Sequence, residues 1–203
     1  MFRLVPVLII LFCSSCSFLA GSIYGIKSPK KLNQTEIASQ AKKYNIPLEN
    51  SFELDTAYFF EHLKSFDQKR YFQQINNHSQ ALQSLFFDKD GRLQVFYINC
   101  YAGGFPNLAW NKEGQFNSFP PKPQAPLDSL LDLQTLSRYL IPLPTTKPQN
   151  KISADYTIVV FWNRMMNRQT KHLIQLVQEN AGKAKDQHVQ LLYVNTDNLM
   201  ATN

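Results

Sequence analysis

The chain has 203 residues, of which 44% are hydrophobic and 13% aromatic, and its 21 basic against 15 acidic side chains give a formal charge of +6. This composition supports a packed core and excludes a disordered chain, a collagen-like chain and a protein with several membrane spans. The basic residues are spread along the sequence, so the charge suits an anionic membrane surface, and we expect no nucleic-acid partner.

Residues 1–16 have the pattern of a secretory signal peptide. Arg3 is followed by nine apolar residues, 4–12, and then by Cys13-Ser14-Ser15-Cys16. This arrangement resembles the signal of bacterial lipoproteins, in which small residues precede a cysteine that is lipidated on its sulfur and becomes the mature N-terminus. The resemblance implies a lipid on Cys16, although Cys13 stands where the family usually has leucine.

The lipoprotein resemblance also implies a location. The domain would lie in the cell envelope and face the periplasm, with the membrane as a partner through the lipid anchor. Ser17, in place of an aspartate after the lipidated cysteine, favours the outer membrane. The alternative is an uncleaved anchor, because apolar residues continue loosely to Ile26 and approach the length that spans a bilayer.

Residues 17–32 are predicted to be a tether, and residues 33–100 to form N-terminal helices and a β-hairpin. Glycines and lysines in residues 21–31 suit a flexible segment that stays close to lipid headgroups. A helix is predicted from Asn33, which is one of its candidate caps, and Pro47 follows its end. The same helical spacing predicts two short helices within residues 52–77, packed on a sheet.

A change to strand-like spacing predicts hairpins in the middle of the chain. Residues 82–87 and 92–100 flank the turn Asp88-Lys89-Asp90-Gly91, which is typical of a β-hairpin. A second hairpin is predicted with strands at 107–110 and 115–119, on either side of a turn at 111–114.

Proline-rich connections separate the remaining elements. Prolines between residues 120 and 126 make a stiff connection to a helix predicted over 127–140, and a second linker leads to residue 151. Residues 156–162 and 189–194 are apolar strands on either side of an amphipathic helix at 168–180. This order predicts a βαβ unit in a parallel sheet, and so a mixed α/β fold with flanking helices.

The segment 158–171 resembles the signature of the thioredoxin family, in which a strand ending in Phe-Trp leads through a short loop to a helix that opens at Cys-x-x-Cys. Residues 189–197 are similar to that family's next strand and its terminal acidic residue, Asp197. Aligned on Trp162, the two thiol positions hold Met166 and Gln169, and the family's buried carboxylate position holds Val160. The resemblance implies a thioredoxin-like domain over residues 101–203 that lacks the groups for thiol–disulfide exchange.

The chain ends before the second half of a thioredoxin fold, which consists of a cis-proline loop, a hairpin and a last helix. One interpretation is a circularly permuted domain, in which residues 103–140 complete the sheet begun by residues 156–197 and Pro106 is the cis-proline. The other is a separate antiparallel meander at 82–119, joined to a partial thioredoxin-like unit. The sequence leaves both open.

Cys100 is the one free thiol that a mature chain starting at Cys16 retains, so no internal disulfide is expected. It is the candidate nucleophile of a monothiol peroxidase or a reductase-like enzyme. No base or resolving thiol lies near it in the sequence, and the alternative is a strand cysteine that acts as a small buried hydrophobe.

Four further groups of side chains are candidates for sites. The histidines have no metal-ligand spacing and are expected at the surface, so no metal or cofactor is predicted. Asp155 and Asp197 flank the two late strands, as carboxylates at strand ends often do. A solvated basic face, with an acidic partner as the alternative, is expected from Arg164, Arg168 and Lys171. An apolar docking surface is expected from Phe105, Trp110, Met165 and Met166, and the alternative is that these residues are part of the core.

Together these patterns predict an envelope lipoprotein that binds or assembles with a protein or peptide rather than catalysing a reaction. The alternative is a thiol-dependent enzyme that uses Cys100. A purely structural envelope component is a third interpretation.

Overall fold

The computed structural model describes residues 25–99, 110–144 and 154–201. Cys16, Cys100 and Pro106 lie outside the described residues, and so do Phe105 and the first strand residues of the second predicted hairpin, 107–109. The predictions that concern these residues therefore stay predictions.

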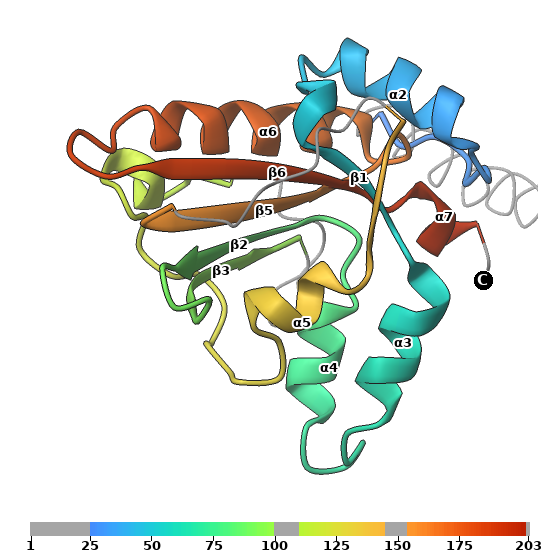
Figure 1. Ribbon diagram of the computed structural model, residues 1–203, viewed down its shortest axis with the longest axis horizontal. Coiled ribbons are helices and arrows are strands. Elements are labelled where there is room, and N and C mark those ends of the chain that lie inside the picture. The colour runs from blue at the N-terminus through green and yellow to red at the C-terminus, as the bar shows by residue number, and fades with distance from the viewer. Residues whose placement is uncertain (1–24, 100–109, 145–153, 202–203) are drawn as a thin grey trace, which may run out of the picture.

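A six-stranded sheet in the order β3-β2-β5-β6-β1-β4 forms the centre of the molecule (Figure 1). The strands are β1 (Ser51–Leu54), β2 (Gln83–Asp88), β3 (Leu93–Ile98), β4 (Leu140–Pro142), β5 (Tyr156–Trp162) and β6 (Val189–Asn195). Strands β5, β6 and β1 run parallel, whereas β2, β3 and β4 join antiparallel to their neighbours. The mixed α/β fold class is thus confirmed.

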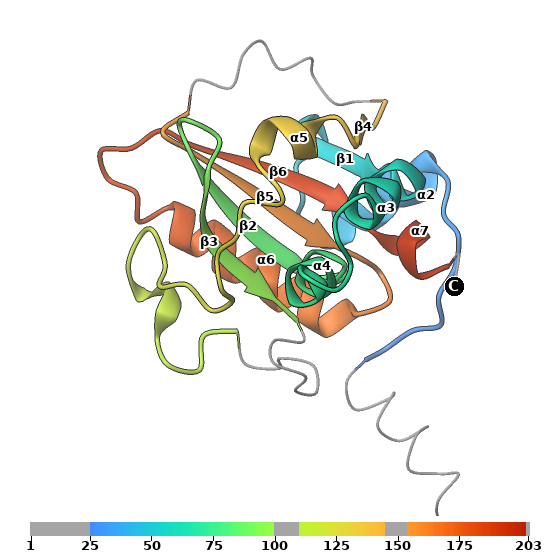
Figure 2. The ribbon, with the colours of Figure 1, turned by 90° about the horizontal axis from the view of Figure 1, so that it is seen from below.

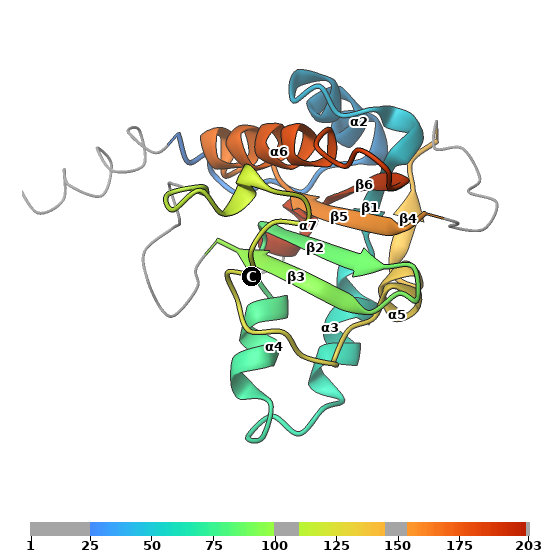
Figure 3. The ribbon, with the colours of Figure 1, turned by 90° about the vertical axis from the view of Figure 1, so that its left-hand side faces the viewer.

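Helices cover both faces of the sheet (Figures 1 and 3). Helices α2 (Gln34–Lys43) and α6 (Asn167–Ala181) lie on one face, and α3 (Thr56–Lys64), α4 (Phe72–His78) and α5 (Leu133–Ser137) on the other. Alternate residues of β5 point into the two cores: Val160 and Trp162 toward α2 and α6, and Val159 and Phe161 toward α3, α4 and α5. Burial on both faces explains why this strand is apolar throughout.

Three elements form where their local sequence predicts them. Asn33 caps α2 in a capping box, since its side chain accepts the N–H of Glu36 while the Glu36 carboxylate accepts the N–H of Asn33. Strand β5 spans the predicted residues, and α6 extends the predicted helix by one residue at each end. The first hairpin is β2–β3, and its turn has Gly91 at φ +78°, a conformation that glycine adopts without strain.

The hairpin β2–β3 belongs to the same sheet as the βαβ unit, because β2 pairs with β5 along residues 83–88. The antiparallel strands beside β5 therefore come from residues 83–98 and not from residues 103–140. A separate meander at 82–119 is equally inconsistent with this pairing. Figure 2 shows the hairpin lying against the central parallel strands.

The second predicted hairpin is wrong over the described residues 110–119, which form turns and the 3-10 helix η3 (Gln115–Asn117). Trp110 and Phe116 are both 1% exposed, because they pack into the core beneath α6 instead of alternating along a strand. Asn180 of α6 fixes this segment by donating its side-chain N–H to the carbonyl of Phe116 at 3.0 Å.

The helix predicted over residues 127–140 is also wrong in extent. Asp132 caps the five-residue α5, and the chain then enters β4, the edge strand that pairs with β1. Strands β1 and β4 have four and three residues, too short for a period-two pattern to stand out, and the sequence did not predict them.

Candidate functional site

The carboxyl ends of β5 and β6 meet the start of β2 and the end of β3 at one edge of the sheet. Gln83 lies opposite Phe161 and Ile98, and Trp162 lies opposite Asn195. The first turn of α6 stands at the same edge. In open sheets this is where binding sites form, since the loops that follow parallel strands converge there. This edge buries an unusual set of polar side chains: Asn99, Asn163, Gln169, Thr170, Asn195, Thr196 and Asp197.

Asn163, the first residue after β5, is a fully buried hub of hydrogen bonds. Its Oδ1 accepts the backbone N–H of Met166 at 2.7 Å, and its Nδ2 donates to the carbonyl of Ala81, just before β2, at 3.2 Å. The hydroxyl of Thr170 donates to the Asn163 carbonyl at 2.7 Å. One side chain therefore sets the shape of the loop and ties α6 to two strands.

Asp197, the first residue of α7 (Asp197–Met200), secures the other side of the loop. Its carboxylate accepts the backbone N–H of Arg164 at 2.9 and 3.0 Å and the side-chain N–H of Asn195 at 2.9 Å. Asp197 is 1% exposed, so these bonds lie in a region of low dielectric constant where they are strong. The neighbouring Thr196 hydroxyl donates to the Ala81 carbonyl at 2.7 Å.

Met166 and Gln169 both lie at the start of α6. Met166 precedes the first residue of the helix and is 7% exposed, and Gln169 in the first turn is 4% exposed. Asn99 at the end of β3 donates its Nδ2 hydrogen to the thioether of Met166 at 3.5 Å. Neither a thioether nor an amide can exchange with a disulfide, so these two positions carry no thiol chemistry.

Trp162 is fully buried, and its ring meets the ring of Tyr44 edge to face at a centroid distance of 5.7 Å. The Tyr44 hydroxyl donates to Asn167 Oδ1 at 2.9 Å. Burial, together with repulsion by the Asp197 carboxylate, raises the pKa of Tyr44 to about 12. Tyr44 is therefore a neutral hydrogen-bond donor next to the loop.

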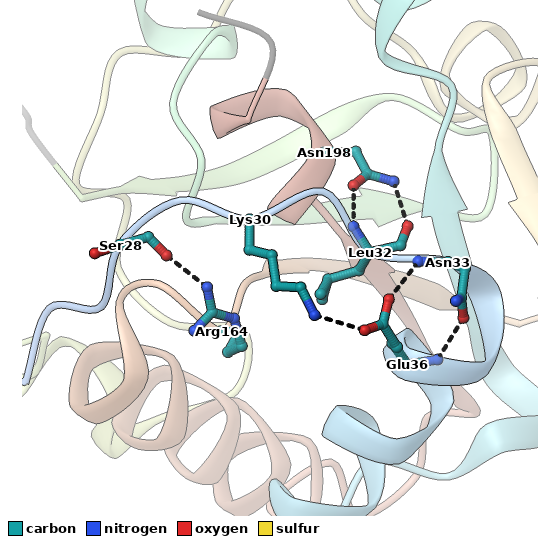
Figure 4. A network of polar contacts seen from close by, with 7 residues as sticks. All are labelled: Ser28, Lys30, Leu32, Asn33, Glu36, Arg164 and Asn198. Carbon is teal, nitrogen blue, oxygen red and sulfur yellow. Dashed lines mark hydrogen bonds and ion pairs between the residues drawn. The ribbon is translucent and has the colours of Figure 1, made fainter.

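Residues 25–32, which we call the strap, lie across the outside of the loop (Figure 4). Lys27 donates its backbone N–H to the Met165 carbonyl at 2.8 Å, and Arg164 Nη2 donates to the Ser28 carbonyl at 2.5 Å. The side chain of Asn198 in α7 accepts the N–H of Leu32 at 2.8 Å and donates to the Leu32 carbonyl at 3.0 Å. This part of the predicted tether is docked on the domain and is not a free linker.

Arg164 therefore serves the chain itself, because its guanidinium holds the strap at Ser28. At the other end of the strap, Lys30 pairs with Glu36 at 2.7 Å. The hydrogen bond from the Lys30 ammonium holds the pKa of Glu36 below its ordinary value, helped by the backbone N–H of Asn33. The strap is thus continuous with the capped start of α2.

For Trp110, Met165 and Met166 the structure supports the alternative of core packing and not an apolar docking surface. Trp110 and Met166 both belong to the core beneath α2 and α6, and half-buried Met165 packs against that core. An apolar side chain in a short connecting segment has no periodic pattern around it, so the sequence does not show whether it lies in the core or at the surface.

The expectation that all histidines lie at the surface is wrong for His78, which is fully buried at the end of α4. Its Nε2 lies 3.0 Å from the Asp128 carboxylate, and its ring stacks on Phe96 at a centroid distance of 4.8 Å. Asp128 also accepts the N–H of Leu130, so the pair fastens the segment before α5 to the end of α4.

Asp155 and Asp197 are engaged at opposite ends of the parallel strands, since Asp155 accepts the N–H of His188 at 2.7 Å. Across residues 25–99, 110–144 and 154–201, no cluster of three histidine, cysteine or acidic side chains is arranged to hold a metal ion. Within the same ranges, no helix combines the length and apolar character required to cross a bilayer.

A cleft of about 490 Å³ opens beside the strap, where β1 leads into α3. Lys31 and Asn198 border it on the strap side, and Glu53, Phe60 and Lys64 line the rest with their neighbours. The mixture of both charges with one aromatic ring suits a polypeptide better than a small anion.

Sequence reasoning singled out Arg164 and Asp197 but missed Asn163, Thr196 and Asn198, although a signal was present. Asn163 directly follows one apolar strand, and the polar run 195–198 directly follows the next. Because adjacent parallel strands end at the same edge of a sheet, these polar residues were bound to meet. Comparisons with models of protein families, with curated proteins and with solved structures find no match to this chain.

Proposed function

We propose that this protein is an envelope lipoprotein that is anchored to the outer membrane through Cys16, faces the periplasm, and binds a protein or peptide partner through a redox-inactive, thioredoxin-like domain. The observation that carries the proposal is the burial of Met166, which directly precedes α6, and of Gln169 in the first turn of that helix. These are the positions at which the resemblance puts a dithiol.

The strand order supports the thioredoxin-like part of the proposal. A parallel β5–α6–β6 unit has an antiparallel hairpin, β2–β3, beside β5, and β1 lies parallel to β6 on the other side. The family has a parallel βαβ half and a hairpin half, which are joined in one sheet. In this chain the hairpin precedes the βαβ unit, so the proposal includes a rearranged order of the two halves.

Binding rather than catalysis is favoured by the way the loop is held. Asn163 and Asp197 fix its backbone with hydrogen bonds from both sides, and the side chains at the thiol positions are chemically inert. A surface of fixed shape loses little conformational entropy when a partner binds, which favours affinity.

The dithiol part of the proposal is tested by restoring the thiols. We expect the wild-type protein not to catalyse the reduction of insulin by dithiothreitol, and the double variant Met166→Cys, Gln169→Cys to form an internal disulfide and gain this activity. The matched control, Met166→Ser with Gln169→Ser, should stay inactive. A double cysteine variant that folds but forms no internal disulfide would contradict the thioredoxin-like geometry.

A separate assay, thiol-dependent consumption of peroxide, decides between binding and the thiol enzyme. If the wild-type chain consumes peroxide in a thiol-dependent reaction that Cys100→Ser abolishes, the protein is a thiol-dependent enzyme and the binding proposal is wrong. If Cys100→Ser changes nothing in this assay, the enzymatic alternative is removed.

The anchor is tested in a bacterial host by labelling with radioactive palmitate and separating the membranes. We expect label on the wild-type protein and none on Cys16→Ser, whereas the matched control Cys13→Ser should be labelled like the wild type. Label that is retained in Cys16→Ser but lost in Cys13→Ser would show that the lipid is attached to Cys13. An unlabelled wild-type protein would contradict the proposal that this protein is a lipoprotein.

A further inference from the structure

The surface under the strap holds the backbone of the strap and engages its side chains at two positions, Leu32 and Lys30. Four hydrogen bonds from the domain to residues 27, 28 and 32 of the strap end on a main-chain N–H or carbonyl. Figure 4 shows those at Ser28 and Leu32. We infer that this surface, which consists of Arg164, Met165, Asn198 and Glu53, is a binding site for an extended peptide, and that residues 25–32 occupy it in cis.

Asn198 supplies the most specific part of the site. Its side-chain amide accepts the N–H and donates to the carbonyl of the same residue, Leu32, as in a two-bond backbone clamp. The Glu53 carboxylate accepts a hydrogen bond from the same Nδ2 of Asn198 at 2.6 Å and so fixes the orientation of the amide. An amide that pairs with both polar groups of one residue requires an extended backbone there and is indifferent to the side chain.

Arg164 and Met165 hold the other end. The Met165 carbonyl accepts the N–H of Lys27, and the Arg164 guanidinium donates to the carbonyl of Ser28. Ser28 and Leu32 are four residues apart, which corresponds to about 14 Å of extended chain. The site therefore takes a peptide of about six residues, fixed at both ends.

Side-chain selectivity is concentrated at two positions of the ligand. Leu32 is 5% exposed and packs in the core beneath α2 and α6, whereas Ile26 is 41% exposed and residues 27–31 are also exposed. Lys30 pairs with Glu36. The preferred partner is thus an extended segment with an apolar residue at the Asn198 clamp and a basic residue two positions before it.

The strap is expected to be displaceable because Leu32 is the one buried residue among residues 26–32. As part of the same chain it acts at an effective concentration in the millimolar range, so it reduces the apparent affinity of a peptide added in trans. A variant that weakens the strap without touching the site should uncover the site.

This inference rests on the proposed binding role but requires neither the lipid nor any thiol. The experiment uses the full-length chain in detergent micelles and a fluorescent peptide with the sequence of residues 25–33. We expect weak binding to the wild type and binding at least tenfold tighter to Leu32→Ser, in which the strap has lost its buried side chain. Adding Asn198→Ala to Leu32→Ser should remove the gain, and a peptide with serine in place of its leucine should not bind.

A second strap variant guards against loss of folding in Leu32→Ser. Lys27→Pro removes the N–H that bonds to Met165 and changes a side chain that is exposed, so it should also bind the peptide more tightly than the wild type does. Equal affinity of the wild type and both strap variants would overturn the inference, because the strap would then be a permanent part of the fold. That result would leave the insulin and palmitate experiments to decide the proposed function.

Discussion

The carboxylate of Asp197 at the end of β6 accepts the backbone N–H of Arg164 after β5 at 2.9 and 3.0 Å, with Asp197 only 1% exposed. A buried carboxylate thus links the loops that follow two adjacent parallel strands. Arg164 in turn holds the strap through its side chain, so Asp197 stabilises both the loop and the surface on which the strap lies.

Asp197→Asn should lower the free energy of unfolding by about 1.5–3 kcal/mol, the usual contribution of a hydrogen bond to a charged group. The asparagine side chain has the same shape as the aspartate but carries no charge. Its NH2 group also replaces one of the two carboxylate oxygens that accept N–H groups in the wild type. Urea unfolding measures the change. The control is Asp155→Asn at an exposed site, for which we expect a smaller loss; equal losses would show that the bonds of Asp197 are no stronger than those of a surface carboxylate.

Asn163→Ala should cost about 1–3 kcal/mol for each buried group that it leaves unpaired. The variant removes the acceptor of the Met166 N–H and the donor to the Ala81 carbonyl. Hydrogen exchange should show faster exchange of the Met166 amide, while the amides in the centre of β5 stay protected. Asn76→Ala at an exposed position of α4 is the matched control and should change neither measurement.

The pair His78 and Asp128 should behave as a coupled unit in a double-mutant cycle. Asp128→Ala leaves His78 buried without its partner and should cost on the order of 3 kcal/mol. His78→Phe keeps the ring stack on Phe96, so the double variant should lose less than the sum of the two single variants. Strict additivity in urea unfolding would rule out an energetic link between the two side chains.

Stability should fall in alkali as buried tyrosines lose their protons. The pKa of Tyr44 is about 12 in the folded state against 10.0 for the exposed group, and burial also raises the pKa values of Tyr97 and Tyr193. The folded state retains these protons after the unfolded state has released them. Stability is therefore independent of these groups below about pH 10 and decreases above it, by about 1.4 kcal/mol per pH unit for each tyrosine.

Tyr44→Phe tests this dependence at one site. Between pH 10 and 12 the unfolding free energy should fall less steeply with pH than in the wild type. The difference in slope should be about 1.4 kcal/mol per pH unit, which corresponds to one proton. Tyr58→Phe, which changes a side chain that is 64% exposed, should leave the slope unchanged. An unaltered slope in Tyr44→Phe would show that the Tyr44 hydroxyl ionises equally in both states.

Elements with a strong local pattern were predictable from the sequence. The turn at Gly91 with its alternating flanks determines the hairpin β2–β3, the apolar run determines β5, and Asn33 with Glu36 determines the start of α2. The absence of thiols at the aligned positions is likewise a fact of the sequence. Each of these features depends on residues that are close neighbours in the chain, so periodicity and capping rules apply to them directly.

The tertiary structure alone decided how these elements come together. Strand β2 lies beside β5 and β1 beside β6, and neither pairing has a signal in the local pattern. The site depends on hydrogen bonds between residues far apart in the sequence: 82 residues from Asn163 to Ala81, and 166 from Leu32 to Asn198. The physical reason is that polar groups at strand ends and along an extended segment take whichever partner the fold brings within hydrogen-bonding distance. Only the packing of both cores determines that partner.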